Sequence, residues 1–205
     1  HEYTQDNLTY IHAGSANLVE RLYIDGSNNT SVITDRTPAS GFTAAANNMW
    51  QFDVLYDTVA MSPANKIVAQ VAPNLQCICN SVGGEIFPGD LLDTAVVLHP
   101  YLIFFGTAGY WGWSVPGDPA DLTGGGSGDA VITGQKIVRG LPLRGGPGNS
   151  PSGLFWSADS LLRASYVGGA TTWQFDTLST QTSILSAQSV IEYDGIFYWI
   201  GTDRF

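Results

Sequence analysis

The stretch that decides the fold of this chain is AVVLHPYLIFFGTAGYWGWSVPGDPADLT, residues 95–123. An apolar run from Val96 to Phe105 is interrupted by Gly106–Gly109 and resumes over residues 110–113. Aromatic-rich runs of strand length, bounded by glycine and proline, are typical of a β-hairpin with one buried face. The stretch therefore predicts two antiparallel strands joined at Gly106–Gly109.

Similar apolar runs lie on both sides of this stretch. They predict strands at residues 49–56, 66–72 and 75–78, and then four pairs: 130–133 with 136–138 across Gly134-Gln135, 154–157 with 161–167, 173–178 with 182–185, and 190–193 with 196–200. Asp194-Gly195 is the clearest two-residue turn. Residues 139–153 are expected to be a loop. No window shows a capped helical period, and residues 42–46 could form one helical turn.

The aromatic positions suggest a repeat. Trp50, Phe105, Trp156 and Trp199, taken as matching inner-strand positions, are spaced 55, 51 and 43 residues apart. A propeller blade of four short strands takes roughly 40–50 residues. The sequence thus predicts an all-β fold of antiparallel meander sheets forming a β-propeller or part of one, with a β-sandwich or barrel as the alternative.

The polar first part of the chain is expected to be distinct from the rest. Residues 1–47 are predicted to be an N-terminal arm or hairpin segment, with apolar islands at 22–24 and 31–34 on either side of Asp25-Gly26. Residues 48–205 are predicted to be the propeller-like domain. Both chain ends suggest a piece of a longer polypeptide.

The charge composition limits the possible partners. Charged residues make up 13% of the chain, about half of the usual share of roughly 25%. A surface so poor in charge must be covered by uncharged polar residues or by other subunits. The net charge of −10, with only eight basic residues, argues against tight binding to nucleic acid. The charge alone favours an acidic soluble protein with no nucleic-acid role, and it is also compatible with an acidic wall past which DNA slides. No apolar run approaches the ~18–20 residues of a membrane span, so no membrane anchor is expected.

The sequence carries no recognisable catalytic motif, and we expect no enzyme activity, cofactor or metal. His1, His12 and His99 are scattered, and Cys77 and Cys79 have no partners for a zinc site, so they are interpreted as reduced core residues. Two carboxylate pairs, Asp90 with Asp93 and Asp118 with Asp121, stay open as candidates for a glycosidase site. Trp111 and Trp113 share one strand face and could stack sugars or bases, although packing in the core is favoured.

Several segments resemble a family of tailed-bacteriophage virion proteins. The similarity covers roughly residues 33 to 205, and the matching segments are 33–38, 113–119, 136–146, 153–163, 183–186 and 192–205. The family resembles the propeller-bearing tail nozzle or hub proteins of short-tailed phages, and its chains normally continue into further hairpins.

The resemblance implies a structural role in the virion, which is assembled in the host cytoplasm. It implies a ring of identical copies, commonly a hexamer, that contacts other tail or adaptor proteins and lines or closes the DNA exit channel without binding DNA specifically. Arg139, Arg144 and Arg163 are candidates for ion pairs between subunits, and Trp111 and Trp113 for the same interface. The competing hypotheses are a carbohydrate-binding or glycan-cleaving propeller of the tail-adhesin kind, and a plain interaction domain.

Overall fold

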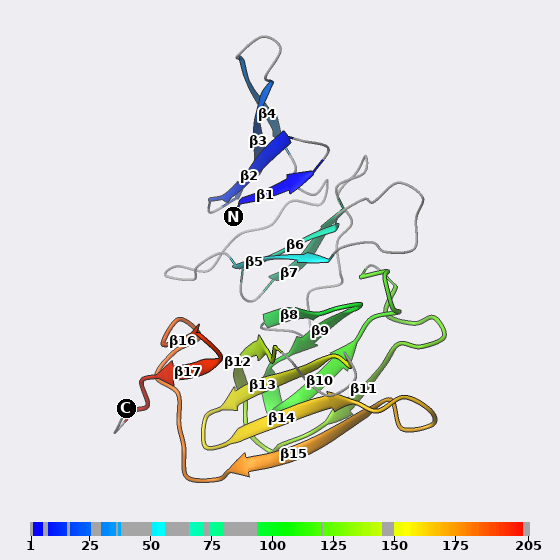
Figure 1. Ribbon diagram of the computed structural model, residues 1–205, viewed down its shortest axis with the longest axis vertical. Helices are drawn as coiled ribbons and strands as arrows, with labels where there is room; N and C mark the ends of the chain where they lie inside the picture. The colour runs from blue at the N-terminus through cyan, green and yellow to red at the C-terminus, as the bar shows by residue number, and fades with distance from the viewer. Residues whose placement is uncertain are drawn as a thin grey trace. The chain divides into compact units, whose positions relative to one another are not determined.

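The protein is described from a computed structural model, and in the residues that it describes every regular element longer than a single turn is a β-strand (Figure 1). The structure describes residues 2–5, 8–15, 17–25, 30–35, 37, 51–55, 66–71, 74–79, 94–119, 121–144 and 150–202. The only helical element in these ranges is a short 3-10 turn at Thr107–Gly109. The same ranges hold no helix with the length and apolar character that a membrane crossing requires. The chain divides into two units, residues 1–92 and 93–205.

The first unit contains two antiparallel meander sheets. One has four strands in chain order, and the other has three. Their strands are β1 (Glu2–Gln5), β2 (Leu8–Gly14), β3 (Val19–Asp25) and β4 (Thr30–Asp35), and then β5 (Gln51–Leu55), β6 (Lys66–Val71) and β7 (Asn74–Cys79). The pairing of β3 with β4 confirms the hairpin predicted around Asp25, and β7 contains both cysteines. The expected domain boundary after residue 47 and the helical turn at 42–46 lie outside the described residues.

The second unit contains two four-stranded meanders and a hairpin (Figure 1). The first sheet has the order β11-β10-β9-β8, the second has the order β12-β13-β14-β15, and β16 pairs with β17. The strands are β8 (Thr94–Leu98), β9 (Tyr101–Phe105), β10 (Tyr110–Trp113), β11 (Gly128–Val131), β12 (Ile137–Pro142), β13 (Ser152–Ser157), β14 (Leu161–Tyr166), β15 (Trp173–Ser179), β16 (Val190–Tyr193) and β17 (Ile196–Trp199).

Residues 95–123, which were predicted to form two strands, contribute to three: β8, β9 and β10. The turn at Gly106–Gly109 joins β9 to β10 as predicted, but the apolar run before it folds back on itself at His99-Pro100, a cis peptide bond. Leu98 and Tyr101 are directly opposite each other on either side of this turn. The turn was missed because His99 and Pro100 are the only interruption in the otherwise apolar run from Val96 to Phe105, and the run was taken as one strand.

Two predicted pairings are wrong. Residues 131 and 137 belong to different sheets, so Gly134-Gln135 is a crossing between sheets and not a hairpin turn. Val131 is 71% exposed whereas Ile137 is fully buried, and this difference is invisible to a local turn signal. Residues 182–185 form no strand, and β15 pairs with β14 instead. The loop expected at 139–153 is shorter, because both of its ends belong to β12 and β13.

The core of the second unit lies between its two four-stranded sheets. Side chains from both sheets form one buried cluster of aromatic and aliphatic residues: Val96, Leu98, Tyr101, Ile103, Phe105, Trp111, Ile137, Phe155, Leu162, Ala164 and Trp173. Phe105 and Phe155 meet edge to face, with ring centroids 5.1 Å apart. Gly140 is directly opposite Phe155 and makes room for its ring, because a Cβ there would lie 2.6 Å from that ring.

The fold class is confirmed as all-β with antiparallel meander sheets. Phe105 and Trp156 lie in the second strands of the two four-stranded sheets and Trp199 in the second strand of the hairpin, while Trp50 lies outside the described residues, so the blade repeat stays a prediction. None of the sheets in the described ranges closes on itself. The arrangement is that of a β-sandwich or a propeller-like fold.

Candidate functional site

The two indoles of β10 are the first candidate site. They lie on the same face, with ring centroids 5.7 Å apart. Trp111 is fully buried and lies edge-on to Trp173 at 5.0 Å and to Phe175 at 4.9 Å. Trp113 is half-buried, and its Nε1 donates a hydrogen bond of 2.8 Å to the carbonyl of Gly126. A fully buried ring offers no face to a ligand, so the pair packs the core and does not form a stacking platform.

Arg163 is paired within its own sheet. It is directly opposite Asp176, and its Nη2 and Nε donate hydrogen bonds of 2.6 and 3.2 Å to Asp176 Oδ2. The bonds from Arg163, together with one from Gln174, lower the pKa of the Asp176 carboxyl. Both side chains are partly exposed to solvent, so the pair adds little to stability. Arg163 therefore already has an acidic partner on its own chain.

The other two arginines differ in exposure. Arg144 is 84% exposed, and its Nε is 3.9 Å from Glu192 Oε2. Arg139 is half-buried in β12, where it is paired with Trp156 across the ladder. Of the three arginines, Arg144 is the one with most of its side chain available to a partner.

The C-terminal hairpin has two apolar faces. The inner face, formed by Val190, Phe197 and Trp199, packs on a cluster of Leu154, Trp156 and Ile184. On the opposite side of the hairpin, Ile191 is paired with Tyr198, and Tyr193 with Ile196. These four side chains and Ile200 are between 51% and 74% exposed. We call these five residues the hairpin face.

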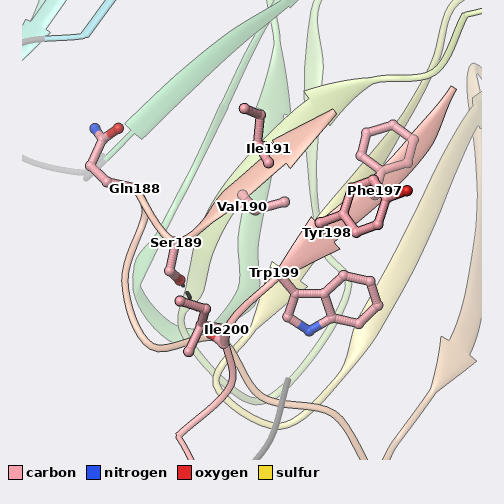
Figure 2. A pocket seen from close by; sticks show the side chains of 8 residues that line it. All are labelled: Gln188, Ser189, Val190, Ile191, Phe197, Tyr198, Trp199 and Ile200. Carbon is pink, nitrogen blue, oxygen red and sulfur yellow. Dashed lines mark hydrogen bonds between the residues drawn. The ribbon is translucent and has the colours of Figure 1, made fainter. Parts of the chain in front are cut away.

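A groove of about 760 Å³ runs along this hairpin (Figure 2). Figure 2 shows the side chains that line it, which come from residues 188–191 and 197–200. Monomeric proteins rarely leave contiguous apolar surface of this kind in water, and such surface marks interaction sites. The sequence signal for this surface is that both alternating sets of residues in 196–200 are apolar.

Comparisons with models of known protein families and with curated proteins find no match. The functional interpretation therefore rests on the sites themselves and on the resemblance described above.

Of the two candidate carboxylate pairs, the structure describes Asp118 and Asp121. Asp121 Oδ1 accepts hydrogen bonds from the backbone N–H groups of Thr123 and Gly124, at 3.0 and 2.8 Å. These bonds lower the pKa of Asp121, whereas a glycosidase general acid needs a raised pKa. Asp90 and Asp93 lie outside the described residues. Within the described ranges, no group of three metal-ligating side chains is found.

A polar hollow lies beside the turn between β13 and β14. It has a volume of about 560 Å³, and its lining residues are Ala158, Asp159, Thr180, Gln181, Thr182, Ser183 and Thr202. Asp159 Oδ1 accepts a hydrogen bond of 3.0 Å from Ser157, a buried hydroxyl that also lies 2.6 Å from Ser160 Oγ. Hydroxyl, amide and carboxylate groups around one hollow are the chemistry that recognises a sugar.

Proposed function

We propose that this chain is a structural component of a bacteriophage virion, a subunit of a tail nozzle or hub ring that lines or closes the DNA exit channel. The ring is made of identical copies, a hexamer by the family resemblance, and it contacts other tail or adaptor proteins. It is assembled in the host cytoplasm and is not an enzyme.

The observation that carries this proposal is the hairpin face. Its five large apolar side chains are each more than half exposed, which suits a surface that another protein covers. The low share of charged residues, 13%, fits a chain whose outer surfaces are mostly contacts between subunits. The net charge of −10 fits a duct in which DNA phosphates are repelled and do not stick.

The experiment is electron microscopy of the purified chain in negative stain. The proposal predicts rings or short tubes of uniform diameter. Single particles of monomer size at every concentration would contradict it.

The second candidate is a carbohydrate-binding or glycan-cleaving domain of a tail adhesin. The polar hollow around Asp159 and Thr182 is the observation that favours it, because the buried Trp111 cannot serve as a sugar platform. A glycan array distinguishes the two candidates. Binding to a defined glycan that is lost in Asp159→Asn, with unchanged oligomeric state, would favour the adhesin over the nozzle.

A further inference from the structure

The turn between β16 and β17 contains one of the two Asp-Gly pairs in the sequence, Asp194-Gly195; the other is Asp25-Gly26. Asp-Gly pairs are prone to isomerisation of the backbone, because glycine has no side chain to shield its nitrogen from the carboxyl of the preceding residue. Asp194 and Gly195 are both exposed. Asp194 also has a φ of 51°, a left-handed conformation that few residues other than glycine adopt. The turn therefore combines a reactive sequence with an unusual backbone conformation.

The isomerisation begins with ring closure between these two residues. The backbone nitrogen of Gly195 bonds to Asp194 Cγ, and the hydroxyl of the protonated carboxyl leaves with the amide hydrogen as water, which gives a five-membered succinimide. Water then opens this ring at the backbone carbonyl of Asp194, so that the chain runs through Cβ and Cγ as an isoaspartyl residue. One water is lost and one is gained, and the reaction consumes no oxidant or cofactor.

The native turn holds the reacting atoms apart. Positive φ at both residues, 51° and 76°, is that of a type I′ turn, in which ψ of the first residue is about 30°. Ring closure needs Cγ and the nitrogen of Gly195 on the same side of the Cα–C bond, which is met at ψ of about −120°, the value for the first residue of a type II′ turn. The φ of Asp194 suits both turns. A flip of the peptide group between Asp194 and Gly195 therefore separates the native turn from the reactive one.

One hydrogen bond opposes this flip. The N–H of Gly195 belongs to that peptide group and donates a hydrogen bond of 2.8 Å to Glu192 Oε1. The flip turns this N–H to the other side of the turn, so the bond must break first. A hydrogen bond to a carboxylate is stronger than one between neutral groups. The side chain of Glu192 is 22% exposed, and its second oxygen lies 3.9 Å from Arg144 Nε.

We propose that Asp194-Gly195 is a site of isoaspartate formation, and that Glu192 suppresses the reaction by holding the peptide group in its type I′ orientation. The reaction needs no partner and no ring of subunits. It therefore goes beyond the proposed virion role and is independent of it.

The modification changes the hairpin that the turn closes. An isoaspartyl residue adds one carbon to the backbone of a two-residue turn, so Tyr193 and Ile196 can no longer keep the pairing that flanks it. Phe197 and Trp199 pack on the cluster that contains Trp156, and a loss of register loosens that packing. Because the reaction does not readily reverse, it releases the hairpin slowly as the protein ages.

Peptide mapping after storage at neutral pH and physiological temperature tests the proposal. Electron-transfer fragmentation in a mass spectrometer distinguishes isoaspartate from aspartate at residue 194. We expect slow accumulation in the parent chain. Glu192→Ala is expected to raise the rate about three- to tenfold, which corresponds to the loss of one hydrogen bond at a partly exposed site. Glu192→Gln keeps an amide oxygen as acceptor and should raise the rate less.

Three controls make the measurement specific. Arg144→Gln removes the cation beside Glu192 but leaves the bond to Gly195, so the rate should stay close to that of the parent. Asp194→Ser should give no product at this position. The parent chain in concentrated urea has lost the turn and should react faster than the folded chain. Hydrogen exchange of residues 190–199 establishes that the hairpin of each variant is folded before storage.

Three results would overturn the proposal. One is the same rate in the parent, Glu192→Ala and Glu192→Gln while the hairpin stays folded. Another is a slower reaction in Glu192→Ala, which would mean that the carboxylate assists the attack by Gly195 as a base. The third is a rate in the folded parent equal to that in urea, which would mean that the turn does not protect its own peptide group.

Discussion

Replacing Trp111 by alanine separates a core role from a binding role. Trp111 is fully buried and touches aromatic rings from both sheets, among them Trp173 and Phe155. Truncation of a buried tryptophan costs about 3–5 kcal/mol through lost burial and the cavity left behind. Its Nε1 has no hydrogen-bond partner in the described ranges, so the change also removes a buried donor that is not satisfied. We therefore expect about 3–4 kcal/mol of destabilisation.

The matched control is Trp113→Ala in the same strand. Trp113 is half-buried and donates its Nε1–H to Gly126, so its loss should cost about 1–2 kcal/mol. Urea unfolding is followed by pulsed hydrogen exchange of peptides from residues 94–202, which reports on the second unit alone. At a slope of about 1.5 kcal/mol per M, a loss of 3 kcal/mol lowers the midpoint by about 2 M.

The result that would refute the reasoning is a reversal of this order. If Trp111→Ala left the unfolding midpoint of the second unit within a few tenths of a molar of the parent, the indole would not be a core residue. The same conclusion would follow if Trp113→Ala were the more damaging change. A role for Trp111 in a ligand site would then have to be reconsidered.

Three further changes test the packing, the ion pair and the turn of the second sheet. Gly140→Ala is expected to destabilise by about 1–3 kcal/mol, because the new Cβ would meet the ring of Phe155; an unchanged melting temperature would reject this close approach. The Asp176 carboxyl, whose pKa Arg163 lowers, should titrate below 3.8 in a carbon-13 NMR experiment. The stability that this pair contributes is present above about pH 4 and is lost as the pH falls through the lowered pKa. Asp176→Asn should therefore reduce the loss of folding stability at low pH. An acid unfolding transition identical to that of the parent would contradict the pair. Ser157→Ala should cost about 1–3 kcal/mol because its buried hydroxyl bonds the β13–β14 turn, and thermal unfolding checks this.

The parts of the fold that sequence predicted are those in which local chemistry decides the structure. Asp194-Gly195 specifies a two-residue turn because both residues tolerate positive φ, and the structure has the two strands paired on either side of it. The positions of β13, β14 and β15 followed from apolar runs bounded by polar, glycine and proline residues.

The wrong predictions concern which strand pairs with which. The sequence predicted a hairpin over residues 130–138. In the structure Ile137 is buried and belongs to a different sheet from Val131, and no local signal in the sequence indicates that β12 pairs with β13. The sugar platform was an open alternative because period 2 places Trp111 and Trp113 on one face without saying whether that face is covered. Two apolar faces on residues 196–200 were visible, but only the structure separates the packed face from the exposed one.

The central claim is that the hairpin face is a surface for protein contact, and hydroxyl-radical footprinting tests it most directly. The exposed rings of Tyr193 and Tyr198 react readily in a monomer, and both should become protected as the concentration of the chain rises into its assembled state. Trp111, which is fully buried in the core, is the internal reference and should stay unreactive at every concentration. Protection of residues 191–200 on assembly is the predicted result. Full reactivity of both tyrosines in every assembled state would contradict the account.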